Sequence, residues 1–255
     1  MAAEKQNKNG RLRLKQDLAK GSFQKLYVLY GEEDYLREYC LRQLKAKVVD
    51  ETFADFNLIE LDGKTMTPDD LTEAVDSYPA MSDRKLVIVT DFNLYAPPAA
   101  FGDKLLDLLS DLPDYVCLVF YFDVLEAKPD KRTKVYKLLD KVACIAEFSR
   151  LEERELIEHI ERRARSLGCT IAPDDASYMI FLCGNSLTNL MGEVEKAAAH
   201  STTGEIKRYN IDAVCSPVLD AVVFDLTDAV TAGRFERAVA LVGELLAQKN
   251  NEVMI

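Results

Sequence analysis

The sequence predicts an α/β domain built on a parallel sheet, followed by a part that is helical throughout. Over residues 1–148, five short runs of strand length alternate with amphipathic helical stretches. Continuous apolar strands separated by helices are typical of a parallel sheet that is covered on both faces. After residue 149, helical periodicity continues without a further strand-like run.

Apolar spacing and breaker residues define the elements of the first domain. Residues 1–10 are polar and are expected to fray, whereas residues 11–20 are helix-like and stop at Gly21. The five predicted strands are KLYVLY (25–30), FNLIEL (56–61), KLVIV (85–89), VCLVFYF (116–122) and CIAEF (144–148). The helices between them are 34–49, 68–77, 101–112 and 130–142. Right-handed crossovers between successive strands then give a three-layer domain.

The rest of the chain is predicted to form two helical parts, 149–216 and 217–255. Helical periodicity in the first part covers 151–167, 174–182, 187–199 and, briefly, 211–214. In the second part, the stretches 220–231 and 235–248 are separated by Gly233. Two helices do not readily enclose a core, so we expect residues 217–255 to be a third domain that is cut short or needs neighbours.

Composition excludes several function classes. The chain of 255 residues is 48% hydrophobic, which is ordinary for a folded protein, and its net charge of −11 argues against a free-standing nucleic-acid-binding protein. Residues that could form a membrane span or a secretory signal are lacking, so we expect no membrane partner and a cytoplasmic location. The six cysteines contain no closely spaced pair and there are two histidines, which predicts buried free thiols and no metal site.

In an ATPase with this arrangement of strands and helices, the turn after the first strand would bind the phosphates of ATP. It reads GEEDYL (31–36), with one glycine, no Lys-Ser or Lys-Thr pair, and three successive carboxylates where phosphates would lie. Asp91 stands one position late for a magnesium-binding acid after a strand, and the helix opening at 184–190 carries no arginine. The sequence therefore predicts an ATPase-like scaffold without catalytic residues and without a nucleotide cofactor.

Two further features allow more than one interpretation. Residues 1–26 carry a net charge of +5 and residues 128–141 of +4, which leaves −20 elsewhere. These basic stretches could face DNA or an acidic partner, or they could be ordinary solvated helix faces. The connection Tyr78-Pro79-Ala80-Met81 is apolar where a solvent-facing turn would be polar. Its side chains could project to bind a partner, or fold back to cap the sheet.

Several stretches, in order along nearly the whole chain, resemble the delta subunit of bacterial DNA polymerase III, the clamp-opening subunit of the clamp loader. They are KLYVLYGEEDYL (25–36), LIELDGK (58–64), YPAMSDRKLVIVTDF (78–92), CLVFYF (117–122), LEERELIEHIERRARSLGCTI (151–171) and VFDLTDAVTAGRFERAVALVGELL (223–246). The resemblance implies an AAA+-type α/β domain without a P-loop, a small helical lid domain, and a helical collar domain of which only the start is present.

The resemblance also implies a site and a set of partners. Proteins of this family bind the beta sliding clamp through an apolar pair at a helix tip, which corresponds here to Ala80 and Met81, with Tyr78 and Pro79 beside them. The family often has a larger residue in place of Ala80, so Met81 is expected to make more of the contact. The implied partners are the clamp, the tau/gamma and delta-prime subunits, and primer-template DNA, with polymerase activity only in the holoenzyme.

Within such a complex, the second basic stretch becomes a candidate for facing DNA. Its residues are Lys128, Lys131, Arg132, Lys134 and Lys137. Two alternatives remain beside the clamp-loader interpretation: a divergent AAA+ ATPase, and a DNA-binding module of a replication or repair complex.

Overall fold

The computed structural model describes residues 2–127 and 129–218 and, beyond them, 226–227, 230–231, 233–236, 238–240 and 242. The chain divides after Arg150 into two compact units, Met1–Arg150 and Leu151–Ile255. Most of the predicted third part, 217–255, lies outside the described residues. Among the helices of the described part, none is both long and apolar enough to cross a membrane.

The first unit contains a five-stranded sheet in which all pairings are parallel. Its strands are β1 (Leu26–Tyr30), β2 (Leu58–Asp62), β3 (Lys85–Thr90), β4 (Val116–Tyr121) and β5 (Cys144–Glu147). Their order across the sheet is β2-β3-β4-β1-β5. The predicted parallel sheet is confirmed, and β1, β3 and β4 are buried along almost their whole length, as continuous apolar runs require.

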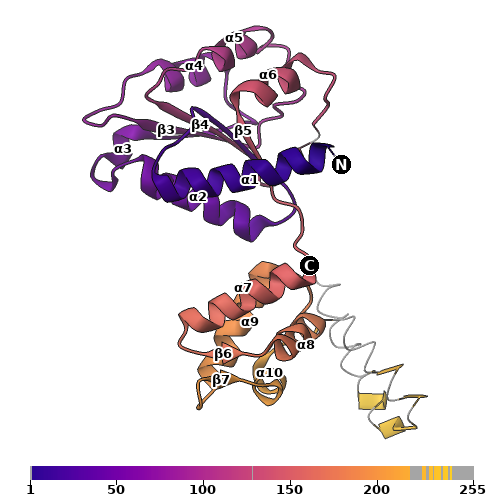
Figure 1. The fold of residues 1–255 in the computed structure, drawn as a ribbon. Coiled ribbons are helices and arrows are strands. Elements are labelled where there is room, and N and C mark those ends of the chain that lie inside the picture. Colours follow the sequence, from indigo (N-terminus) through magenta and orange to yellow (C-terminus); the bar gives the residue numbers. More distant parts are fainter. Residues whose placement is uncertain are drawn as a thin grey trace. The chain divides into compact units, whose positions relative to one another are not determined.

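Helices cover both faces of this sheet (Figure 1). One face carries α1 (Ala2–Lys20) and α2 (Asp34–Val48), and the other carries α4 (Pro68–Asp76), α5 (Lys104–Ser110) and α6 (Lys134–Val142). Alternate residues of each strand enter opposite cores, because successive side chains of a strand point to opposite faces. Thus Val28 packs with α4, α5 and α6, whereas Tyr27 and Leu29 pack with α1 and α2.

Several boundaries in the first unit differ from the prediction. The first helix begins at Ala2 and not at residue 11, since alanine, glutamate, lysine and glutamine in the leader all favour a helix. The second strand begins at Leu58 and not at residue 56, because a 3-10 turn (Glu51–Phe53) and the short α3 (Ala54–Asn57) precede it. The basic helix begins at Lys134 and not at residue 130, and the Thr133 hydroxyl caps its first turn.

The second unit is mainly helical, with α7 (Glu153–Ser166), α8 (Pro173–Cys183), α9 (Leu187–His200) and α10 (Arg208–Val214). The expectation that it contains no strand is wrong. The two-residue strands β6 (Thr170–Ile171) and β7 (Glu205–Ile206) pair in parallel. Runs of two residues show no alternation, so the sequence pattern could not reveal them.

Two helical glycines are expected to respond oppositely to alanine. A Cβ at Gly10 of α1 would overlap the carbonyl of Ile145 in β5, whereas a Cβ at Gly192 of α9 meets nothing within 4 Å. We expect Gly10→Ala to lower the free energy of unfolding by about 1–3 kcal/mol through overpacking. Gly192→Ala should raise it by about 0.5–1 kcal/mol. Urea unfolding measures both, and a stabilised Gly10→Ala variant would contradict this packing of α1 on β5.

Candidate functional site

The apolar loop Tyr78–Met81 lies between the end of α4 and the start of β3. Tyr78 is 83% exposed and Met81 is 86% exposed, while Pro79 and Ala80 are partly buried. The sequence left open whether these side chains project into solvent or fold back onto the sheet. The two large ones, Tyr78 and Met81, project into solvent. The loop presents apolar surface to solvent directly after a helix.

A fully buried asparagine fixes the middle of this loop. The Asn57 side chain accepts a hydrogen bond from the Ala80 N–H (2.8 Å) and donates one to the Ala80 carbonyl (2.9 Å). Asn57 is the last residue of α3 and is completely buried. Its amide thus satisfies both backbone groups of Ala80, as a neighbouring strand would.

A buried lysine fixes the start of the loop. Lys85, the first residue of β3, is 1% exposed and donates through Nζ to the carbonyl and to the hydroxyl (2.9 Å) of Ser77. Nζ also lies 5.6 Å above the ring of Tyr115. Burial lowers the pKa of Lys85 to about 8, against the opposing effect of the Asp76 carboxylate. The last turn of α4 is thereby tied to the sheet.

Further contacts hold the Tyr78 ring and the residues after Met81. The Tyr115 hydroxyl donates to the Asp76 carbonyl (2.9 Å), and its ring centroid lies 5.1 Å from that of Tyr78. After Met81, Arg84 donates to the Phe23 carbonyl (2.9 Å). With Lys85 and Asn57, these contacts restrain the loop from before Tyr78 to beyond Met81.

Met81 has a backbone conformation that disfavours large side chains. Its φ is +51°, in the left-handed region, which costs roughly 1–2 kcal/mol for a residue with a Cβ. A glycine would remove that cost. The chain instead places an exposed apolar side chain there, and strained, exposed residues of this kind are a reason to look for a binding role.

The sequence pattern gives no sign of one exposed residue of this region. Phe56 was placed in a strand, but it lies in α3 with 69% of its side chain exposed. It directly precedes Asn57, while Tyr78 and Met81 lie within two residues of Ala80. The contact between Asn57 and Ala80 therefore has three exposed apolar residues close to it in sequence. The strand-like alternation of FNLIEL concealed it, because the true strand starts two residues later.

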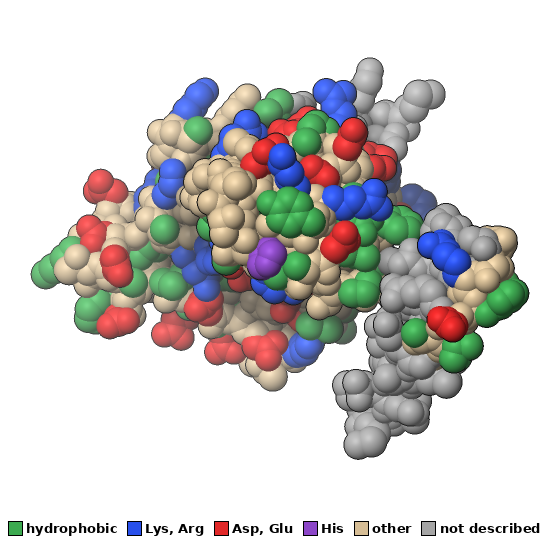
Figure 2. Space-filling model, turned by 90° about the horizontal axis from the view of Figure 1, so that it is seen from below, with side chains coloured by type: hydrophobic (Ala, Val, Ile, Leu, Met, Phe, Trp, Pro, Cys, Tyr) green, Lys and Arg blue, Asp and Glu red, His purple; other side chains and the backbone are tan. Residues whose placement is uncertain are grey.

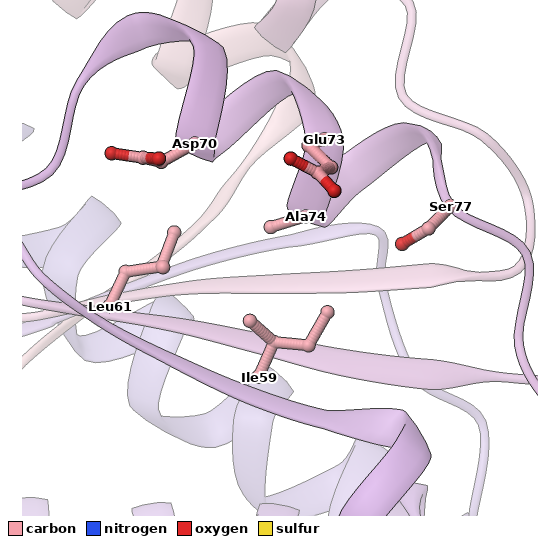
Figure 3. Close-up of a pocket in the computed structure, with 6 residues that line it drawn as sticks. All are labelled: Ile59, Leu61, Asp70, Glu73, Ala74 and Ser77. Atoms are coloured by element: carbon pink, nitrogen blue, oxygen red, sulfur yellow. The ribbon is translucent and has the colours of Figure 1, made fainter.

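A shallow groove of about 290 Å³ adjoins the start of the loop (Figure 3). Ile59 and Leu61 of β2 form its floor, and one side of α4, from its first turn to the residue after its end, forms the opposite wall. The wall residues are Asp70, Glu73, Ala74 and Ser77. None of the six lining residues is basic, so the groove does not suit a phosphate.

The carboxyl edge of the sheet, where an ATPase would bind phosphates, is filled by protein groups. Glu33 is 5% exposed, and its N–H donates to the Phe148 carbonyl (2.8 Å). The buried Arg37 donates to the carbonyls of Gly31 and Asp123. A Cβ at Gly31 would overlap the Phe148 backbone, and its φ of +129° suits glycine alone.

Asp91, the residue compared above with a magnesium-binding acid, also has structural contacts. Its carboxylate accepts hydrogen bonds from the backbone N–H groups of Asp123 (2.8 Å), Val124 (3.0 Å) and Leu125 (2.9 Å), and lies 3.6 Å from Lys64 Nζ. Burial alone would raise its pKa, but these donors and Lys64 together lower it. Asp91 therefore ties the end of β3 to the loop after β4.

The predicted DNA-facing residues are only partly assembled. Lys128 lies outside the described residues, while Lys131, Lys134 and Lys137 are exposed. Arg132 donates to both carboxylate oxygens of Asp130 (3.0 and 2.9 Å), so its charge is largely paired. Figure 2 looks at the chain from below Figure 1 and shows basic and acidic side chains interspersed on a face that does not include α6. The structure thus leaves two exposed lysines one turn apart on α6 as the core of this patch.

Comparisons with known proteins agree with the resemblance. Residues 27–149 match the family described as DNA polymerase III, delta subunit. DNA polymerase III subunit delta of Bacillus subtilis is 25% identical over 244 residues, which cover 93% of this chain and 70% of that protein. The probable DNA polymerase III subunit delta of Aquifex aeolicus is 23% identical over 231 residues, covering 88% of this chain and 64% of that protein.

Solved structures share the fold. The DNA clamp loader delta protein of Bacillus subtilis has a TM-score of 0.69 at 23% identity, covering 93% of this chain and 71% of that one. A RuvB mutant of Thermotoga maritima has a TM-score of 0.51 at 14% identity, covering 82% and 67%. The resemblance to the DNA polymerase III delta subunit is confirmed, and the fold is that of the clamp loader delta protein.

The buried Glu33 predicts a pH dependence of stability. Burial and the nearby Asp34 raise its pKa to about 7 from its usual 4.5, against the opposing effects of Arg11, Arg150 and Arg37. Between these values the unfolded chain releases the proton while the folded chain keeps it, so the stability contributed by protonated Glu33 is lost as pH rises from about 4.5 to 7.

Comparison with a neutral variant isolates this effect. Between pH 4.5 and 7, wild type should lose on the order of 2 kcal/mol of unfolding free energy relative to Glu33→Gln. Chemical denaturation across this range measures the difference. Parallel stability curves for the two proteins would contradict the burial of this carboxyl group.

Proposed function

Because residues 27–149 match the DNA polymerase III delta-subunit family, we propose that this chain binds the beta sliding clamp and helps open the ring for loading onto primed DNA during replication. The observation that supports this best is the loop after α4, in which Met81 is 86% exposed while Asn57 holds Ala80 in place. Its proposed clamp-binding residues are Tyr78, Pro79, Ala80 and Met81.

The loop suits binding because its conformation is set before the partner arrives. Burying a methionine side chain in an apolar pocket contributes about 1.5–3 kcal/mol. Ordering a free loop would offset part of that gain, whereas a loop already held by Asn57 and Lys85 loses less entropy. Opening the ring further requires that the loop bind the open clamp more tightly than the closed one.

The proposal assigns no reaction to this chain. In this scheme ATP is bound and hydrolysed on neighbouring tau/gamma subunits, and polymerase activity belongs to the holoenzyme. The use of Glu33, Arg37 and Asp91 in internal contacts supports such a division of labour. The delta-prime subunit and primer-template DNA complete the proposed assembly, which would act in the bacterial cytoplasm.

Within this chain, the helices of the second unit up to residue 216 would form the lid domain, and residues 217–255 would be the start of the collar domain.

Replacing Met81 by aspartate tests the binding site. We expect at least a hundredfold loss of affinity for the clamp, because a carboxylate buried in an apolar pocket is costly. The fold should persist, since the residue is exposed and aspartate tolerates a positive φ. Surface plasmon resonance against immobilised beta clamp measures the affinity.

Val124→Asp provides a matched control for this experiment. Val124 is also apolar and 80% exposed, but it lies outside the loop, so its replacement should leave clamp affinity within about twofold of wild type. Wild-type affinity of Met81→Asp would refute the assigned site.

The contribution of loop rigidity is tested separately at Asn57. Asn57→Ala leaves every proposed contact residue in place but removes both hydrogen bonds to Ala80. We expect clamp affinity to fall about tenfold, equivalent to about 1.4 kcal/mol, because the loop must then be ordered on binding. Far-UV circular dichroism checks the fold, and unchanged affinity in a folded variant would show that preorganisation plays no part.

Two titrations distinguish the alternative functions. Saturable binding of ATP with magnesium by the purified chain in calorimetry would favour a divergent AAA+ ATPase. Strong DNA binding that weakens steeply with salt would favour a DNA-binding module. We expect the purified chain to show neither ATP binding nor strong DNA binding. Lys131, Lys134 and Lys137 should contact DNA only within the assembled complex.

A further inference from the structure

Three potential metal ligands meet in the interior of the second unit. Cys183 is the last residue of α8, Glu193 lies in α9, and Cys215 follows the end of α10. They are 1%, 4% and 9% exposed. The two Sγ atoms and one carboxylate oxygen all lie within 4.8 Å of one another. The helices of this unit therefore bring together two thiols and a carboxylate that are far apart in sequence.

We propose that Cys183, Glu193 and Cys215 bind a divalent transition-metal ion, with zinc as the best match. Thiolate and carboxylate ligands are both common for zinc, and three protein ligands leave a fourth tetrahedral position for water or a further ligand. Zinc–ligand distances of about 2.0–2.3 Å place neighbouring ligand atoms about 3.3–3.8 Å apart. The three ligand atoms, now within 4.8 Å of one another, would have to move closer together to reach these distances.

The charges around the cluster favour a dication. Lys196 Nζ lies 2.6 Å from Glu193 Oε2, and Lys196 is about half exposed. With both thiols protonated, the carboxylate and this ammonium already balance. Zinc releases the two thiol protons on binding, so that two thiolates balance its two positive charges. The site stays neutral in both states, which a buried position requires.

Two polar contacts of the cluster involve Glu193. Glu193 Oε2 is buried and pairs with Lys196 Nζ, and the Cys215 thiol donates to the Glu193 backbone carbonyl (3.9 Å).

The position of the cluster indicates a structural role. A metal there would join the ends of α8 and α10 to the middle of α9, immediately before the chain continues into residues 217–255. The sequence pattern gives no sign of this cluster, because its two cysteines are 32 positions apart. This inference does not depend on clamp binding.

Metal binding to the full chain tests the proposal. The purified protein, stripped with chelator under reducing conditions, is titrated with Co²⁺ and then with Zn²⁺. We expect one ion per chain, a thiolate-to-cobalt charge-transfer absorption that zinc displaces, and a rise in the melting temperature with zinc. Cys183→Ser and Cys215→Ser should abolish the absorption, and Glu193→Gln should weaken cobalt binding at least tenfold.

Cys169→Ser is the matched control. Cys169 is also buried in this unit, but its thiol contacts the Ala198 carbonyl (3.9 Å) instead of the cluster, so cobalt binding should be unchanged. If a serine variant does not fold, Glu193→Gln decides, since it changes the charge while nearly preserving shape. Absence of stoichiometric binding, or binding equal to wild type in Glu193→Gln and in a folded serine variant, overturns the proposal. A Cys183–Cys215 disulfide in protein purified without reductant, seen as a loss of two hydrogens by mass spectrometry, also overturns it.

Discussion

The parallel sheet imposes a direction on the first unit, and the rest of that unit depends on it. All five strands start at one edge of the sheet, the amino edge, and end at the other, the carboxyl edge. Residues that directly follow a strand therefore lie at the carboxyl edge, and residues that directly precede a strand lie at the amino edge. The turn at Gly31 and the residue Asp91 follow β1 and β3, and therefore lie at the carboxyl edge. The loop with Met81 precedes β3 and lies at the amino edge. Substitutions of residues at the carboxyl edge can thus leave the loop at the amino edge unchanged.

Buried charged side chains fix the turns at both edges of the sheet. At the carboxyl edge, Arg37 and Asp91 bind backbone groups of neighbouring turns, so their charges serve internal contacts. At the amino edge, Lys85 enters the sheet with its ammonium buried against Ser77. An unpaired charge would be costly in either place. The partners of Arg37 and Lys85 are backbone or hydroxyl oxygens, and those of Asp91 are backbone N–H groups, and all of them must remain fixed. Rigid turns at both edges follow from these buried groups.

How much the sequence could predict depended on how local the signal was. The apolar runs of β1, β3 and β4 predicted the sheet, since burial on both faces requires them. The apolar loop was identified from its residue types. The role of Asn57 was not predictable, because its partner Ala80 is distant in sequence and one polar residue beside a strand carries no local signature. The same holds for the meeting of Cys183 with Cys215.

Met81 combines two costs that a loop serving stability alone would avoid. Its φ of +51° is unfavourable for a side chain with a Cβ, and its apolar surface is exposed to water. The contacts of Asn57 and Lys85 compensate for the first cost by fixing the backbone before Met81, and Arg84 fixes it after Met81. They do nothing for the second, which a partner that buries the side chain would relieve. Removal of that exposed surface from water adds directly to affinity, because the backbone strain is already present before binding.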